Sequence, residues 1–138
     1  LILMLFAHLL HLAQALLVAD DEEVNYLYLE VLLKENCKIN CKIIHAKNGK
    51  EAIMYCKETA EISIVFMDLK MPIIDGYEAM RAIKKIRPNL TIIAQTAYAS
   101  DDDVKKILKS GFDNYLSKPI KDTVFKKLIK KYNLKPVN

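Results

Sequence analysis

Residues 62–68 read Ile-Ser-Ile-Val-Phe-Met-Asp, a short run that is apolar almost throughout and ends in a carboxylate. Strands that have helices on both faces of their sheet show this composition, because both of their own faces are buried. Four similar short runs lie on either side of it in the chain, at residues 15–19, 42–45, 91–94 and 114–116. We therefore expect five strands, with residues 62–67 as the central one.

Helical patterns fill the segments between these runs. In the first and last segments, apolar residues recur at i, i+3, i+4 and i+7, at Val24, Leu27, Tyr28 and Val31 and at Phe125, Leu128, Ile129 and Tyr132. The other helices are expected at residues 51–57, 77–86 and 101–109. Ser100 before three aspartates predicts a helix start, and Pro88 and Gly111 predict helix ends. Five strands alternating with five helices predict an α/β domain with a parallel sheet.

Polar side chains stand at the carboxyl ends of the predicted strands, where parallel sheets bind ligands. They are Asp20, Asp21, Asp68, Thr96 and Lys118. Three close carboxylates repel one another, and Mg²⁺, which prefers oxygen ligands, would make such a cluster tolerable. The Lys118 ammonium and the Thr96 hydroxyl could neutralise the oxygens of a transferring phosphoryl group, with Asp68 as the nucleophile.

Each of these residues also has a purely structural interpretation. The aspartates at 20 and 21 could begin a helix, Thr96 could be a turn residue and Lys118 a surface lysine. Asp68 could cap the loop that follows its strand. Their shared position at matching strand ends favours the interpretation as a single site.

Five segments together resemble the response-regulator receiver domains of two-component signalling. They are Leu17–Asp21, Phe66–Asp68, Met71–Tyr77, Ala94–Ala97 and Tyr115–Pro119. The resemblance covers residues 15–132 in the expected order. It implies a flavodoxin-like (CheY-like) three-layer fold with strand order 2-1-3-4-5.

The resemblance also implies roles for individual residues. Asp68 would be phosphorylated from a phosphohistidine, with Mg²⁺ held by Asp21, Asp68 and the backbone carbonyl of Lys70, and by Asp20 through water. Thr96 and Lys118 would contact the phosphoryl oxygens, and Lys118-Pro119 would be a cis peptide. Tyr115 would be a switch aromatic that moves inward when Thr96 shifts. Lys70 and Tyr98 occupy positions that tune the phosphoryl lifetime in this family.

The most similar sub-type is the receiver of hybrid sensor histidine kinases, on the segments Asp21–Asn25, Asn48–Ala52 and Tyr115–Ile120. The expected partner is then a histidine kinase or a histidine phosphotransfer domain, which commonly docks near Asn25 and Tyr28. The domain would catalyse its own phosphorylation and dephosphorylation, and the parent chain could be a kinase. A single-domain regulator and a pseudo-receiver that is not phosphorylated are the alternatives.

Residues 1–14 form an apolar leader with His8 and His11, outside the domain expected at 15–132; residues 133–138 form a tail. We expect the leader to be a linker remnant or a helix that contacts a second copy or a preceding domain. Two histidines at i, i+3 are too few for a metal site.

The remaining composition narrows the class of protein. Three cysteines, at 37, 41 and 56, form no paired framework and indicate reduced thiols, as in the cytoplasm or the cytoplasmic part of a membrane-bound kinase. Cys37, Cys41 and His45 do not have zinc-site spacing. The net charge of +4 is mild and the lysines lie on helix faces, so we expect no direct nucleic-acid binding. An aspartyl phosphatase would often carry a second acid where this chain has Lys70.

Overall fold

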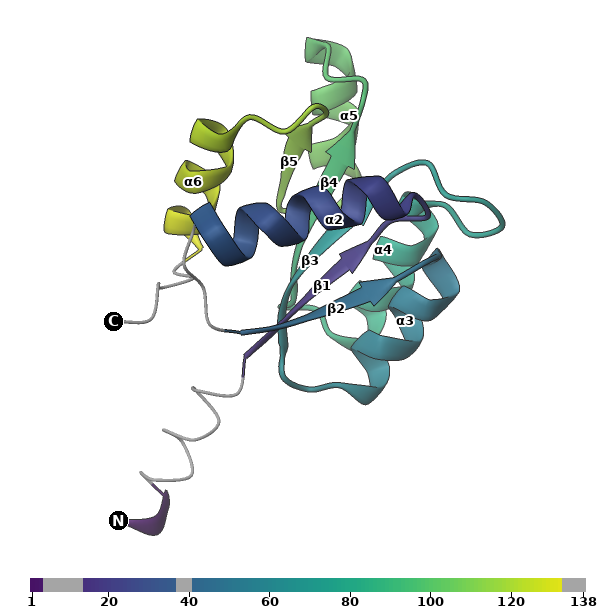
Figure 1. Cartoon of the computed structure of the whole chain (residues 1–138). Helices are drawn as coiled ribbons and strands as arrows, with labels where there is room; N and C mark the ends of the chain where they lie inside the picture. The colour runs from purple at the N-terminus through teal and green to yellow at the C-terminus, as the bar shows by residue number, and fades with distance from the viewer. Residues whose placement is uncertain (4–13, 37–40, 133–138) are drawn as a thin grey trace.

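The computed structural model describes residues 1–3, 14–36 and 41–132. Within them, one parallel sheet of five strands has the order β2-β1-β3-β4-β5 (Figure 1). The strands are β1 (Ala15–Ala19), β2 (Lys42–Ala46), β3 (Ile62–Asp68), β4 (Thr91–Thr96) and β5 (Asn114–Ser117). The helices are α2 (Glu23–Val31), α3 (Gly49–Glu58), α4 (Gly76–Ile86), α5 (Asp101–Ser110) and α6 (Asp122–Lys131). The predicted fold class, strand order and five helices are confirmed.

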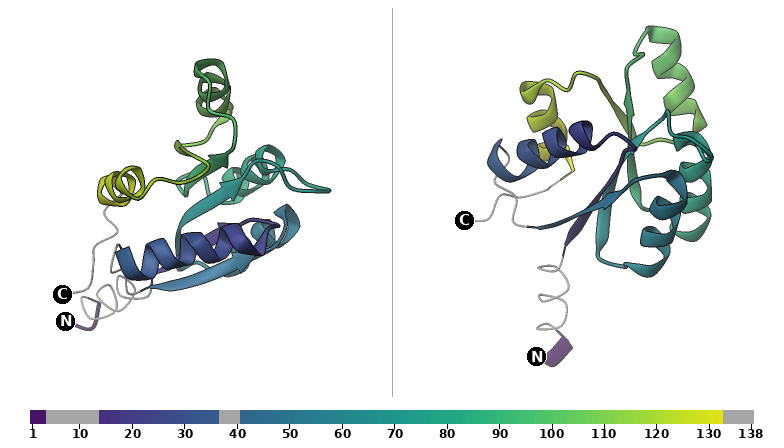
Figure 2. Two further views of the ribbon diagram at one scale, coloured as in Figure 1. Left: turned by 45° about the horizontal axis from the view of Figure 1, so that its top comes forward. Right: turned by 45° about the vertical axis from the view of Figure 1, so that its right-hand side comes forward.

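Helices cover both faces of the sheet, so the domain has three layers (Figure 2). On one face, α3, α4 and α5 bury Ala52, Met80 and Ile107 against alternate residues of the strands. On the other face, α2 and α6 bury Leu29 and Phe125 against the strand residues that point the opposite way. This double cover explains why the strands are apolar almost throughout, since every residue of β1 is buried.

The helix ends follow local side-chain chemistry. Ser100 and Asp103 form a capping box at the start of α5, and Gly111 ends that helix with a φ of 126°. Asn48 and Asp75 cap α3 and α4 by accepting hydrogen bonds from backbone N–H groups. Helix α4 ends at Ile86, two residues before Pro88, as predicted.

Helix α2 is apolar on two faces. On its inner face, Leu29 is fully buried. A short π-helical segment, η1 (Leu32–Asn36), follows the helix, and its Leu33 is buried as well. The apolar stripe that predicted the helix points to solvent instead, with exposed fractions of 76% for Val24, 47% for Leu27 and Tyr28, and 45% for Val31. In α6 the same spacing lies in the core, at Phe125, Leu128 and Ile129. The spacing identified both helices, but it marked the buried face only in α6.

Several expectations concern residues that the structure does not describe. The leader apart from residues 1–3 and 14, the histidines at 8 and 11, Cys37 and the tail lie outside the described residues. Cys41 and Cys56 are free thiols, and burial raises the pKa of each to about 11. None of the described helices is both long enough and apolar enough to cross a membrane.

Candidate functional site

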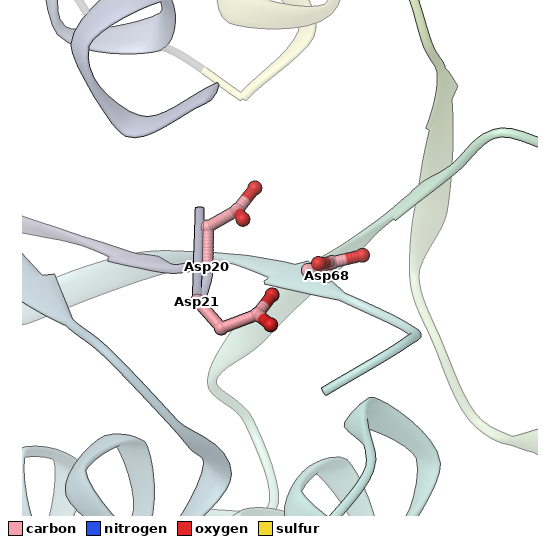
Figure 3. Close-up of side chains that lie close together, drawn as sticks. All are labelled: Asp20, Asp21 and Asp68. Carbon is pink, nitrogen blue, oxygen red and sulfur yellow. The ribbon is translucent and has the colours of Figure 1, made fainter. Parts of the chain in front are cut away.

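Three carboxylates converge at the carboxyl end of the sheet. Asp20 and Asp21 follow β1 directly, and Asp68 is the last residue of the neighbouring β3, paired with β1 up to Ala19 and Met67. One carboxylate oxygen from each aspartate lies within 4.8 Å of the others (Figure 3). Oxygen donors in this number suit a hard divalent cation, so the cluster is compatible with Mg²⁺.

Lys118 is the cation that faces these acids. It follows β5, and its Nζ lies 3.3 Å from Asp20 Oδ2 and 3.3 Å from Asp68 Oδ1. Asp20 is fully buried, and Asp68 is 6% exposed. Burial raises the pKa of Asp68 to about 6, although Lys118 opposes the rise; the nearby Asp20 carboxylate adds to it. The site therefore holds more negative charge than its single lysine neutralises.

Hydrogen bonds to its carboxylate and to its backbone hold Asp20 in place. Glu22 N–H donates to Asp20 Oδ1 at 2.9 Å, and His45 Nε2 lies 2.9 Å from the Asp20 carbonyl oxygen. Because a carbonyl only accepts, that nitrogen carries the proton. The ring of His45 stacks on Tyr26 of α2, with centroids 3.9 Å apart and planes at 2°.

Sequence reasoning missed this role of His45, which it considered only as a possible zinc ligand. A signal was present, since His45 is the one imidazole in an otherwise apolar stretch of β2 beside the acids. The pattern could not show which backbone oxygen the ring would reach.

Thr96 ends β4 beside the acids, but its hydroxyl is engaged locally. It donates to the Tyr98 carbonyl at 2.9 Å and accepts from the Tyr98 N–H at 3.0 Å. Tyr98 is 59% exposed, and the Lys70 ammonium lies over its ring, 4.2 Å from the ring centroid. Lys70 N–H also points to Asp68 Oδ1 at 3.3 Å. Lys70, Thr96 and Tyr98 line an open pocket of about 610 Å³ with Met71 and Lys106.

Tyr115 and Pro119 complete the set of predicted site residues. Tyr115 on β5 is half-buried and packs against the core on the α4–α5 side of the sheet. The Lys118–Pro119 peptide bond is cis. All the residues proposed for the site thus lie at or near the carboxyl ends of β1, β3, β4 and β5 or in the loops that follow them.

Comparison with known proteins agrees with this arrangement. The family model for the response regulator receiver domain matches residues 16–130. The chain belongs to the response regulator receiver domain family. It is therefore a receiver domain of two-component phosphorelay signalling, as its sequence indicated.

Three relatives show how far the similarity extends. Hybrid signal transduction histidine kinase I of Dictyostelium discoideum is 40% identical over 115 residues, which are 78% of this chain and 6% of the kinase. The receiver domain of the sensor histidine kinase PA1611 from Pseudomonas aeruginosa has a magnesium ion coordinated in its active site cleft; it is 26% identical with a TM-score of 0.75, and the match covers 87% of this chain and 97% of that one.

The third relative is a receiver with a partner. The Ssk1 receiver domain of Saccharomyces cerevisiae, crystallised with the histidine phosphotransfer protein Ypd1, is 30% identical with a TM-score of 0.74. That match covers 87% of this chain and 88% of the other. The receiver relatives thus include one with a magnesium ion in its cleft and one with a phosphotransfer protein beside it.

Proposed function

We propose that this receiver takes a phosphoryl group from a phosphohistidine onto Asp68 and changes conformation to pass on the signal. The observation that supports the proposal best is the position of Asp68. Its carboxylate is 6% exposed at the end of the central strand, beside two other acids and the Lys118 ammonium. A nucleophile so fixed can attack in line while the lysine stabilises the charge of the transferred group.

Magnesium is the proposed cofactor of this step. The donors are all hard oxygens, and the excess negative charge of the cluster gives a divalent cation a favourable place. We propose Asp21, Asp68 and the Lys70 carbonyl as ligands, with Asp20 acting through water. The bound cation would supply positive charge to the phosphoryl oxygens.

The chain's own residues carry out the transfer. An ionised Asp68 oxygen attacks phosphorus, and the bond from phosphorus to the imidazole nitrogen of the donor breaks, so the electron pair leaves with the imidazole. With its pKa near 6, most of Asp68 is ionised at neutral pH. Lys118, already 3.3 Å from Asp68, needs little movement to pair with the new phosphoryl oxygens.

The proposed switch uses Thr96 and Tyr115. The Thr96 hydroxyl donates one hydrogen bond to the Tyr98 carbonyl and accepts another from the Tyr98 N–H. Phosphorylation would offer it a charged acceptor, which makes a stronger bond than a carbonyl. Thr96 would then leave Tyr98, and the half-buried Tyr115 would move into the space vacated beside β4.

The proposed partner is a histidine phosphotransfer domain or histidine kinase that docks on the outer face of α2. Val24, Asn25 and Tyr28 line an open pocket of about 370 Å³ with Pro119 and Ile120, directly beside Lys118. The Tyr28 hydroxyl donates to the Ile120 carbonyl at 2.9 Å, which ties α2 to this loop. An exposed apolar helix face next to a recessed acceptor is suited to a helical partner.

The parent protein is proposed to be a hybrid sensor histidine kinase, with this receiver on the cytoplasmic side of the membrane. The similarity to the Dictyostelium discoideum kinase over 78% of this chain supports the proposal. Because the chain spans 6% of that relative, the activity of the whole protein rests on this likeness alone.

The test is phosphorylation by a small donor. Protein incubated with Mg²⁺ and acetyl phosphate should gain one phosphoryl group by intact mass, and Asp68→Asn should gain none. EDTA should prevent the gain. Folded wild-type protein that gains no mass from either acetyl phosphate or a phosphohistidine donor would favour a pseudo-receiver that signals by binding alone.

A further inference from the structure

One residue of the loop between β3 and α4 is both strained and fully exposed. Ile73 is 95% exposed and has a φ of 71°. The Ile74 N–H donates to the Pro72 carbonyl at 2.8 Å, so residues 72–74 close a γ-turn of the strained form with positive φ at its centre. A β-branched residue is a true outlier there, and water gives its side chain no packing in return.

The surrounding contacts hold this turn in place. A Cβ on Gly49 would come within 2.6 Å of the Ile74 carbonyl oxygen, so Ile74 packs directly on the start of α3. On the return side, Gly76 N–H donates to the Leu69 carbonyl at 3.0 Å, and a Cβ on Gly76 would come within 2.2 Å of the Asp68 carbonyl oxygen. Both ends of the loop are therefore fixed while Ile73 projects between them.

The loop begins and ends at the phosphoacceptor. It leaves β3 immediately after Asp68, where Lys70 N–H points to the carboxylate, and it returns to the Asp68 backbone at Gly76. Figures 1 and 2 show the segment between β3 and α4 projecting beyond the carboxyl end of the sheet. A protein that reaches the buried Asp68 carboxylate from the carboxyl end of the sheet therefore meets a surface that includes this loop.

We propose that Ile73 is a rigid apolar contact that the phosphohistidine-bearing helix of the donor protein grips during transfer. The assignment rests on the proposed function and names a specificity contact for it, in addition to the apolar face of α2. Because both ends of the loop are held and a β-branched side chain is stiff at χ1, Ile73 loses little conformational freedom on binding and so contributes well to docking. The backbone strain at a φ of 71° lowers the stability of the fold, and this cost keeps Ile73 projecting from the surface.

The test compares a large donor with a small one. The donors are Ypd1 of Saccharomyces cerevisiae, phosphorylated on histidine, and acetyl phosphate, each given to the wild-type chain and to Ile73→Gly, Ile73→Asn and Ile73→Leu. Glycine and asparagine accept positive φ but remove the apolar projection, whereas leucine keeps it. Phosphorylation is followed by intact mass, and Tm is measured for every variant.

We expect transfer from phosphorylated Ypd1 to fall by about tenfold or more in Ile73→Gly and Ile73→Asn, and by less than about threefold in Ile73→Leu. Labelling by acetyl phosphate should stay within about twofold for all, because a small donor needs no docking. Tm of the glycine and asparagine variants should equal or exceed that of the wild type, since the strain is relieved.

Three outcomes would overturn the inference. The first is unchanged transfer from Ypd1 in the glycine and asparagine variants. The second is an equal loss with both donors, which would mean that Ile73 shapes the site. The third is a wild type that acetyl phosphate labels and Ypd1 does not. A wild type that neither donor labels would instead count against the proposed function.

Discussion

The two ends of the sheet treat charged groups in opposite ways. At the amino end, Arg87 donates to the carbonyls of Thr59, Ala60 and Ile62, at 2.7 to 3.4 Å. Asp113 at the same end accepts from Lys84 Nζ and from Ile92 N–H, both at 2.8 Å. The Asp113 carboxylate is thus paired with one ammonium group, and each Arg87 contact is to a neutral carbonyl.

At the carboxyl end, negative charge exceeds positive charge. Three acids lie together there, and Lys118 pairs with two of them, Asp20 and Asp68. The contacts to Asp68 are longer at 3.3 Å, and burial raises the pKa of Asp68 to about 6. The two ends therefore contribute differently to stability. The contacts at the amino end stabilise the fold, whereas the excess negative charge at the carboxyl end destabilises it and suits the binding of a cation and a phosphoryl group.

The largest expected effect removes the shared cation of the carboxyl end. Lys118→Ala should slow labelling by acetyl phosphate by about 100-fold, because the phosphoryl oxygens lose a preorganised positive charge. Initial rates from intact mass measure this effect. Lys121→Ala is the matched control, an exposed lysine three residues later whose loss should leave the rate unchanged. Equal rates for the two variants would remove Lys118 from the mechanism.

The next prediction addresses the amino end. Arg87→Ala should lower the free energy of unfolding by about 2 to 3 kcal/mol, because three carbonyls lose a charged donor. Arg87→Lys should recover only part of the loss, since an ammonium cannot reproduce the fork of a guanidinium. Urea unfolding measures both variants. Labelling by acetyl phosphate should not change, and a slowed rate would break the separation between the two ends.

A third prediction uses the titration of Asp68. Its carboxyl ionises near the ordinary pKa of 3.8 in the unfolded chain and near 6 in the folded domain. Between these values the unfolded chain binds fewer protons, so stability falls as pH rises through that window. Asn has no proton to lose. Without Mg²⁺, the free energy of unfolding of Asp68→Asn should therefore exceed that of the wild type by about 1 to 2 kcal/mol at neutral pH. Below about pH 4 the two values should differ little.

Urea unfolding of both proteins across this pH range provides the measurement. Adding Mg²⁺ should stabilise the wild type more than the variant, because the cation binds the ionised cluster. If the difference in stability between the two proteins is the same at every pH, burial does not raise the pKa of Asp68.

From the sequence, the polar residues at the carboxyl end could be expected to lie together, whereas the contacts of the amino end could not be predicted. Asp68 and Lys118 could be placed together because each stands at the carboxyl end of a strand, and parallel strands end at one edge. Arg87 could not be placed, because its three acceptors are backbone carbonyls that look alike in any sequence. The outer face of α2 was hidden for a related reason. Val24 and Tyr28 have the spacing of a core face, and only packing decides which of two apolar faces meets the sheet.

The smallest expected effect concerns the lifetime of the phosphorylated state, and it sharpens the picture of the carboxyl end. The exposed Tyr98 ring lies under Lys70 at 4.2 Å and borders the same pocket as Thr96. Tyr98→Ala would open that pocket to water and should shorten the lifetime of the acyl phosphate by about threefold, whereas Tyr98→Phe keeps the ring and its contact with Lys70. The decay of the phosphorylated mass after the donor is removed measures the lifetime in both variants.

A Tyr98→Ala lifetime equal to that of the wild type would show that the ring does not shield the site. A shorter lifetime in both variants would assign the effect to the hydroxyl. If the acyl phosphate decays faster only in Tyr98→Ala, the ring controls how long the phosphoryl group stays on Asp68. The carboxyl end of the sheet then determines the duration of the signal as well as its start.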